Sequence, residues 1–163
     1  MRKIKRILNA ILIAVELSLI LLMCLWIFCN TAEARETILS EEIVEICKAE
    51  GLEHDVDQYL IMAYCEIESR GIPDVISDNG QYYGLMQLNK DTFEGDLLDP
   101  IVNVSNGAEY LAYLRSYYDG DMWKACSVYC GEGGRIGKAT IRVMMRCFEL
   151  QATYLFNQEV RTI

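Results

Sequence analysis

Two short segments carry the residue types that could do chemistry. The pair Glu68-Ser69 closes an apolar stretch, and the run Gly84-Leu85-Met86-Gln87 follows it along the chain. Burial of a carboxyl group disfavours its charged form and raises its pKa, so that it stays protonated closer to neutral pH. A protonated carboxyl group is a general acid, and the amide of Gln87 supplies hydrogen-bonding groups for a polar ligand. The two segments together indicate an acid catalyst facing a polar ligand.

The element that must position Glu68 is an apolar helix. Acidic residues at 55–57 are typical of a helix start, Gly71 is typical of a stop, and Glu68 follows Tyr64 by one helical turn. A helix that is apolar on nearly every face is buried. We therefore expect the centre of the core at Leu60, Ile61, Ala63, Tyr64 and Ile67. Glu66 should point to the opposite side of the helix from Glu68, in a structural or solvated position.

The remaining elements are expected to be mostly helical around one small β-hairpin. Asn79-Gly80 lies between β-prone residues, which is a strong hairpin signal. Hydrophobic periodicity and breakers predict four more helices, at about 40–49, 100–118, 122–130 and 136–156, the first of them stopped by Gly51. A short helical turn is expected at 84–88 and a polar connection at 89–100. Tyr110, Tyr113 and Tyr117 recur at helical spacing, which predicts packing. The fold class is α+β and mostly α-helical.

A separate segment, 1–34, precedes this domain. Its basic head is followed by a nearly continuous apolar run, 7–29, long enough to span the ~30 Å hydrocarbon core of a bilayer. The sequence Ala32-Glu33-Ala34 is similar to a signal-peptidase site, so 1–34 is predicted to be a signal-anchor or a signal peptide cleaved after Ala34. Residues 35–163 should then be extracytoplasmic, either anchored to the cell membrane or secreted, by the positive-inside tendency.

The charge of the exported part excludes one class of partner. Residues 35–163 contain 11 Lys and Arg against 22 Asp and Glu. Nucleic acid binding depends on clustered basic residues, so no nucleic acid partner is expected. Repulsion from an anionic cell envelope would favour a tether, which 1–34 could supply.

Cysteine and histidine give no sign of a metal or cofactor. The domain has five cysteines, an odd number that leaves at least one thiol free. They are expected to be small buried residues. The sequence leaves undecided whether Cys126 or Cys130 forms a disulfide with Cys65 or Cys147. No C-x-x-C pair is present, and His54 is the only histidine, so no metal site and no cofactor are expected.

Four blocks in order give the sequence a resemblance to a known family. They are Glu66-Ile67-Glu68-Ser69-Arg70-Gly71; Tyr83-Gly84-Leu85-Met86-Gln87-Leu88-Asn89; Asp99-Pro100 with Asn103, Gly107-Ala108 and Tyr110-Leu111; and Trp123-Lys124-Ala125 with Tyr129 and Gly131. Between residues 55 and 134 the chain resembles the soluble lytic transglycosylase family of lysozyme-like enzymes. The resemblance implies a lysozyme-like fold.

The resemblance also implies roles for individual residues. Glu68 takes the place of the sole catalytic acid and base, and the substrate-binding positions fall on Ser69, Tyr83, Gly84, Met86, Gln87 and Tyr129. Cys130 stands where the family has an asparagine, which puts the strength or selectivity of sugar binding in doubt.

The implied reaction is cleavage of the β-1,4 bond between N-acetylmuramic acid and N-acetylglucosamine in peptidoglycan, leaving 1,6-anhydro ends. Small anchored members of such a family would serve secretion or conjugation machinery. Two alternatives stay open: a muramidase that hydrolyses the same bond with water, and a catalytically silent glycan-binding or assembly module, which the Cys130 replacement suggests.

Overall fold

A computed structural model describes residues 36–161, so the predicted signal or anchor segment at 1–34 lies outside the described residues. Within 36–161, no helix has the length and apolar character needed to cross a membrane.

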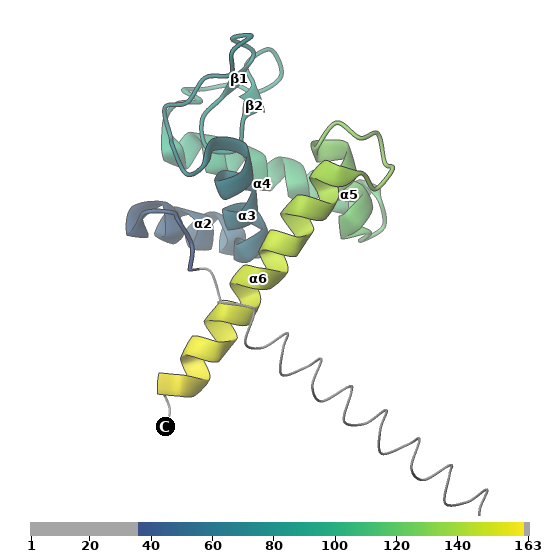
Figure 1. The fold of residues 1–163 in the computed structure, drawn as a ribbon. Coiled ribbons are helices and arrows are strands. Elements are labelled where there is room, and N and C mark those ends of the chain that lie inside the picture. The colour runs from purple at the N-terminus through teal and green to yellow at the C-terminus, as the bar shows by residue number, and fades with distance from the viewer. Residues whose placement is uncertain (1–35, 162–163) are drawn as a thin grey trace, which may run out of the picture. The chain divides into compact units, whose positions relative to one another are not determined.

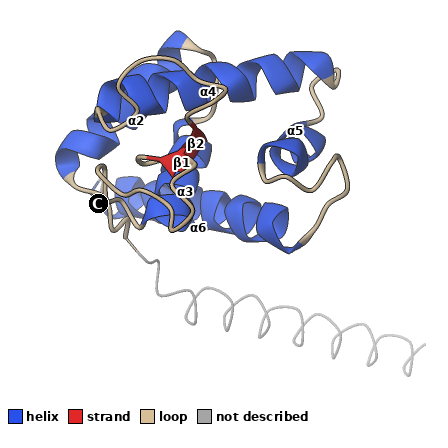
Figure 2. Cartoon of the chain, turned by 90° about the horizontal axis from the view of Figure 1, so that it is seen from above, coloured by secondary structure: helices blue, strands red, loops and turns tan. Residues whose placement is uncertain are grey.

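Five helices and one two-stranded sheet make up the described part of the chain. In order they are α2 (Glu41–Glu53), α3 (Gln58–Ser69), β1 (Tyr82–Tyr83), β2 (Leu88–Asn89), α4 (Pro100–Tyr117), α5 (Met122–Tyr129) and α6 (Lys138–Arg161). Helix α3 packs against α6 and α2, while α4 packs against α2 and α5 (Figure 1). Viewed from above, the sheet lies over α3, between α4 and α6 (Figure 2). The predicted α+β, mostly helical class is confirmed.

Polar side chains fix the start of four helices. A side-chain oxygen of the residue before each helix accepts a hydrogen bond from a backbone N–H of the first turn, which would otherwise have no partner. These capping residues are Ser40, Asp57, Asp99 and Asp121 for α2 to α5 in order. Pro100 follows Asp99 at the first position of α4, where its missing N–H costs nothing.

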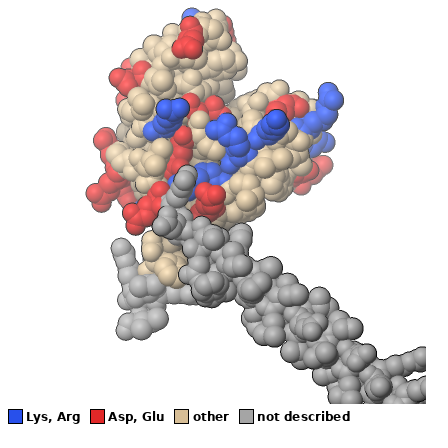
Figure 3. Space-filling view, in the orientation of Figure 1, with Lys and Arg blue, Asp and Glu red and all other residues tan. Residues whose placement is uncertain are grey.

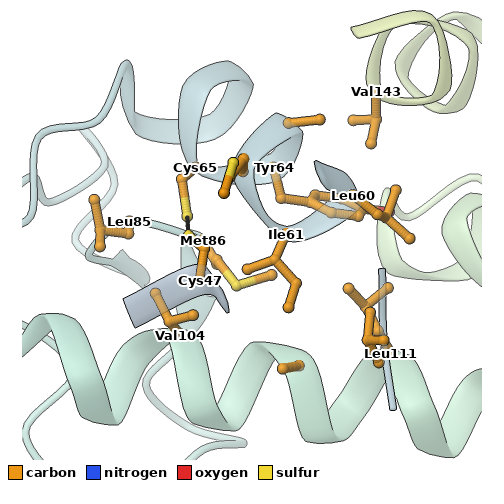
Figure 4. Packing of buried hydrophobic residues seen from close by; sticks show 14 of the residues in the cluster. Cys47, Leu60, Ile61, Tyr64, Cys65, Leu85, Met86, Val104, Leu111 and Val143 are labelled. Carbon is orange, nitrogen blue, oxygen red and sulfur yellow. Dashed lines mark hydrogen bonds between the residues drawn. The ribbon is translucent and has the colours of Figure 1, made fainter. Parts of the chain in front are cut away.

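Helix α3 forms the centre of the core, as its composition predicts. Leu60, Ile61, Ala63 and Tyr64 are buried, and Ile67 is half-buried at the edge of the same cluster. Figure 4 shows Leu85 and Met86, from the β1–β2 connection, packed into this cluster with side chains of α3 and α4. The segment that follows β1 is therefore anchored in the core of the domain.

Gly51 does not end the first helix, contrary to the prediction from sequence. Helix α2 continues through this residue to Glu53. A Cβ atom at Gly51 would lie 2.8 Å from the carbonyl oxygen of Val56 and 3.2 Å from Cα of Gln58. The glycine is required by the close approach of the next turn rather than by a helix stop, and sequence alone does not distinguish these two uses.

The sheet pairs different residues from those predicted. The turn at Asn79-Gly80 is present, but Ile76 forms only a single bridge with Tyr83. The two-residue ladder instead joins Tyr82 and Tyr83 to Asn89 and Leu88. The connection 84–87 is consequently a tight turn and not the helical turn predicted, because Gly84 and Gln87 both have positive φ angles, which interrupt right-handed helical geometry.

The five cysteines of the described region are free thiols, and four of them are buried. The sulfur atoms of Cys47 and Cys65 lie 4.0 Å apart between α2 and α3. The expected role as small buried residues is confirmed for Cys47, Cys65, Cys126 and Cys147, while Cys130 is half-buried, and no disulfide is present among residues 36–161.

A buried ion pair joins α3 to α6. The Arg146 Nε donates to Glu66 Oε2 at 2.6 Å, and the side chains of Arg146 and Glu66 are 12% and 6% exposed. Glu66 Oε1 also accepts from the Thr37 hydroxyl at 2.6 Å and from the Ile38 amide at 3.2 Å. Glu66 is therefore structural and not solvated, and it ties the first described residues to two helices.

Candidate active site

Glu68 lies in the last turn of α3 and is half-buried. Burial raises the pKa of its carboxyl group, and the positive charge of Arg142 on α6 lowers it, with burial the larger effect. A raised pKa keeps more of the acid form near neutral pH. Glu68 thus combines partial access to solvent with a pKa shifted in the direction that favours a general acid.

Ser69, the next residue, ends the helix. Its hydroxyl donates to the carbonyl oxygen of Cys65 at 2.8 Å and accepts from the amide of Gly71 at 3.2 Å. The residue is 4% exposed. Because both bonds are internal and the side chain is buried, Ser69 holds the end of α3 in place beside Glu68 and is not available to a ligand in this structure.

The turn that carries Met86 and Gln87 is held by Asn103 of α4, a fully buried side chain. Its Nδ2 donates to the carbonyl oxygens of Tyr83 at 2.9 Å and Leu97 at 2.8 Å, and its Oδ1 accepts from the amide of Met86 at 2.8 Å. One side chain thus provides partners for three backbone groups of irregular segments, whose burial unpaired would be costly.

Gly84 is needed for this arrangement. Its φ is +73°, and a Cβ atom there would lie 2.3 Å from Asn103 Nδ2 and 2.3 Å from the carbonyl oxygen of Leu97. The absence of a side chain at Gly84, one of the predicted substrate-binding positions, therefore serves the packing of the turn against Asn103 and Leu97.

Gln87 uses one half of its amide to hold the turn. Its Nε2 donates to the carbonyl oxygens of Gly84 at 2.9 Å and Val75 at 3.4 Å. Two carbonyl acceptors on one side fix which end of the amide is nitrogen. Among residues 36–161 the Oε1 atom has no hydrogen-bond partner, so a half-buried acceptor is available to a sugar hydroxyl or acetamido N–H.

Met86 contributes its backbone rather than its side chain. The side chain is fully buried, and a Cβ atom on Gly107 would lie 2.4 Å from its sulfur. The carbonyl oxygen of Met86 accepts a hydrogen bond from the Tyr129 hydroxyl at 3.2 Å. Met86 is therefore a core residue whose main chain links the turn to α5.

Tyr129 brings three elements of the site together. Its hydroxyl is bonded to the turn, and its ring lies 4.4 Å from that of Tyr64 on α3, centroid to centroid. Burial raises the pKa of the Tyr129 phenol well above its usual value, and the negative charge of Glu68 raises it further. The phenol consequently stays neutral, and it lies near enough to Glu68 for the charge of that carboxylate to act on it.

Tyr83 and Cys130 flank this group. Tyr83 is half-buried, and its backbone oxygen is held by Asn103. The half-buried thiol of Cys130 lies 3.8 Å from the Tyr64 hydroxyl. Burial raises the pKa of this thiol, the hydrogen bond with Tyr64 lowers it, and the charge of Glu68 raises it to a smaller extent, with a net upward shift. The position where the family would have an asparagine is thus filled by an uncharged thiol beside the candidate acid.

The structure therefore brings together Glu68, Tyr129 and Cys130, with Gln87 adjoining them through the turn.

Two contributors were missed by sequence reasoning. Asn103 was placed in a motif, but no buried role was predicted for it, although a polar residue on the apolar face of α4 can indicate one. The sequence does not predict that Arg142 acts on Glu68, because the two residues lie 74 positions apart in the chain.

Arg142, the positive charge that acts on Glu68, belongs to a group of basic residues on α6 in an otherwise acidic domain. Lys138 and Arg142 are exposed on α6 one turn apart, and Arg146 follows after another turn. Figure 3 shows Lys and Arg side chains gathered along the upper half of α6, with Asp and Glu elsewhere on that face. Of these basic residues, Arg142 is the one whose charge lowers the pKa of Glu68 against the larger effect of burial.

Comparisons with known proteins agree with this arrangement. The sequence profile described as "Transglycosylase SLT domain" matches residues 32–146. The structure is similar to that of an inactive mutant of lytic transglycosylase Slt from Pseudomonas aeruginosa, with a TM-score of 0.52 and 20% identity. That match covers 72% of this chain and 24% of the other, so the chain spans about a quarter of that protein's length. No curated protein sequence matches the chain significantly.

Proposed function

The chain belongs to the transglycosylase SLT domain family, and from this we propose that it cleaves peptidoglycan glycan strands by lytic transglycosylation. The observation that carries the proposal is the half-buried carboxyl group of Glu68, whose pKa is raised by burial and which lies beside Tyr129 and Cys130.

In the proposed reaction Glu68 acts first as an acid. Its carboxyl group donates a proton to the oxygen between N-acetylmuramic acid and N-acetylglucosamine, and the bond from the anomeric carbon to that oxygen breaks. The bonding pair leaves with the N-acetylglucosamine oxygen, which carries the donated proton. The N-acetyl group of the muramyl sugar assists by stabilising the electron-poor anomeric carbon.

Glu68 then acts as a base. The carboxylate accepts the proton of the muramyl 6-hydroxyl group while that oxygen bonds to the anomeric carbon, giving a 1,6-anhydro sugar. No water is consumed, and Glu68 is returned to its protonated form. Tyr129 and the Gln87 Oε1 atom would hold the sugar or orient the carboxyl group during these steps.

The chemistry of the products tests the proposal. We expect the full-length chain, incubated with purified peptidoglycan, to release muropeptides that end in 1,6-anhydro-N-acetylmuramic acid, detected by mass spectrometry. Reducing ends, heavier by one water molecule, would instead mean hydrolysis by a muramidase. Glycan binding without release of either product would identify a silent binding module, the alternative that Cys130 suggests.

The pH dependence of the rate should depend on Arg142. The acid step requires protonated Glu68, so the rate should fall as pH rises through the raised pKa of that group. Arg142 favours the carboxylate, so its removal in Arg142→Gln should raise the pKa further and move the alkaline limb of the pH–rate profile to higher pH. Lys138→Gln, one turn away, is the matched control. A limb that stays in place or moves to lower pH would contradict the assigned interaction.

We also propose an extracytoplasmic location, either anchored through 1–34 or secreted after cleavage. The basic head and apolar run of that segment support this location, and the excess of acidic residues in 35–163 supports the need for a tether. A small anchored enzyme of this kind would open peptidoglycan locally, which suits a secretion or conjugation complex.

A further inference from the structure

A row of tyrosines lies on the surface of α4 and is not explained by the core. Tyr113 and Tyr117 are 59% and 66% exposed, so the prediction that they pack inside is wrong. The rings of Tyr110 and Tyr113 are 6.3 Å apart and nearly parallel, at 13°, and those of Tyr113 and Tyr117 are 6.1 Å apart. Exposure of several large rings side by side is unusual unless they meet a ligand.

This row is continuous with the candidate active site. The ring of Tyr110 lies 5.6 Å from that of Tyr129, the residue whose pKa Glu68 helps to raise. At the other end, Tyr117 contacts Tyr118 with ring centroids 4.9 Å apart. A single succession of neighbouring rings thus leads from the site to the C-terminal end of α4.

Two basic side chains next to the row already have partners. Arg115, between Tyr113 and Tyr117 in sequence, donates to the carboxylate of Asp55 at 2.9 Å. Lys124 Nζ lies 4.9 Å from the Tyr118 ring centroid, at the far end. The exposed faces of Tyr113 and Tyr117 therefore present aromatic carbon and phenol hydroxyls, a surface suited to a neutral ligand with both C–H and O–H groups.

We propose that Tyr113 and Tyr117 form an extended binding surface for the glycan strand, beyond the sugars held at Glu68. Pyranose rings present C–H groups on their faces and hydroxyls at their edges, which match tyrosine faces and phenols. We assign the glycan strand to this surface because the row of tyrosines adjoins the active site. A polymer whose cleaved bond lies at Glu68 must continue past the site, and the row begins at Tyr129. The inference rests on the proposed function and adds to it a preference for long strands.

Binding, measured without cleavage, tests this surface. The full-length Glu68→Gln chain in detergent would be titrated with long glycan strands freed of their stem peptides, and separately with a tetrasaccharide of the same sugars. Adding Tyr113→Ala and Tyr117→Ala should weaken binding of long strands about tenfold, because two aromatic contacts are lost. Binding of the tetrasaccharide should be unchanged. The pair Tyr113→Phe and Tyr117→Phe should keep most of the affinity for long strands.

Tyr154→Ala is the matched control, because Tyr154 is an exposed tyrosine of α6 outside the row. If the double alanine variant and its parent bind long strands with equal affinity, the extended surface is overturned and the proposed function stands. The same result is expected if the row binds a protein instead of a glycan. Failure of the parent to bind either glycan would overturn both proposals. Equal loss for both glycan lengths would indicate damage to the site and would also overturn the extension.

Discussion

Replacing Glu68 with Gln should reduce the release of anhydro-muropeptides about 10³-fold, since general acid–base catalysis commonly contributes 10²–10⁴. Glutamine has nearly the same shape and can hydrogen-bond the sugar, but it can neither donate the proton to the leaving oxygen nor accept one from the 6-hydroxyl group. Both halves of the proposed reaction therefore fail together. The rate is measured from anhydro ends counted by mass spectrometry under identical conditions.

The matched control for this prediction is Glu94→Gln. Glu94 is an exposed glutamate in the loop between β2 and α4. The Glu94→Gln chain should release anhydro-muropeptides at the same rate as the unmodified chain. The Glu68→Gln chain should also keep its melting temperature and its affinity for the tetrasaccharide. A folded Glu68→Gln chain that still forms anhydro ends at the native rate would remove Glu68 from the mechanism.

Replacing Glu66 with Ala should lower the free energy of unfolding by about 3 kcal/mol, the lower end of the usual effect of removing one partner of a buried ion pair. Arg146, which is 12% exposed, loses its 2.6 Å acceptor but keeps a 3.1 Å pair with the exposed Glu149. It also removes the acceptor of the Thr37 hydroxyl and the Ile38 amide. Chemical denaturation followed by circular dichroism would measure the loss.

A surface ion pair in the same domain provides the comparison. Lys48 and Glu45 are also 2.6 Å apart, but their side chains are 44% and 65% exposed, so Glu45→Ala should change the free energy of unfolding by less than about 1 kcal/mol. Replacing both partners of the buried pair, in Glu66→Leu with Arg146→Met, should recover much of the loss, because the charge of Arg146 then no longer lies beside an apolar side chain. A similar small effect for Glu66→Ala and Glu45→Ala would show that burial does not strengthen the Glu66 pair.

Helix identity was largely predictable because local signals agreed with tertiary structure. Asp57, Asp99 and Asp121 each precede a helix and cap it, and the apolar residues of α3 predicted its central position. The predicted end of the first helix was wrong, because Gly51 allows close packing against the next turn and does not stop the helix. Pairing of β1 with β2 was also missed, since two-residue strands leave almost no periodicity to detect.

The candidate site was predictable only in part. The position of Glu68 on a buried helix followed from sequence, and the structure places Tyr129 beside it. The burial of Ser69 and Met86 could not be read from their types, because both suit a core and a cleft equally well. The orientation of the Gln87 amide depends on Val75 and Gly84, and backbone partners of this kind become visible only when the turn is folded.

Asn103 gives the turn at 84–87 an unusual dynamic character. A short connection between two-residue strands would ordinarily open on its own, at little cost and well before global unfolding. Here the Met86 amide can be released only by breaking a bond to α4, and the same side chain also holds Tyr83 and Leu97. The turn should therefore open only together with α4, and the Gln87 Oε1 acceptor would meet a bound ligand from a rigid backbone.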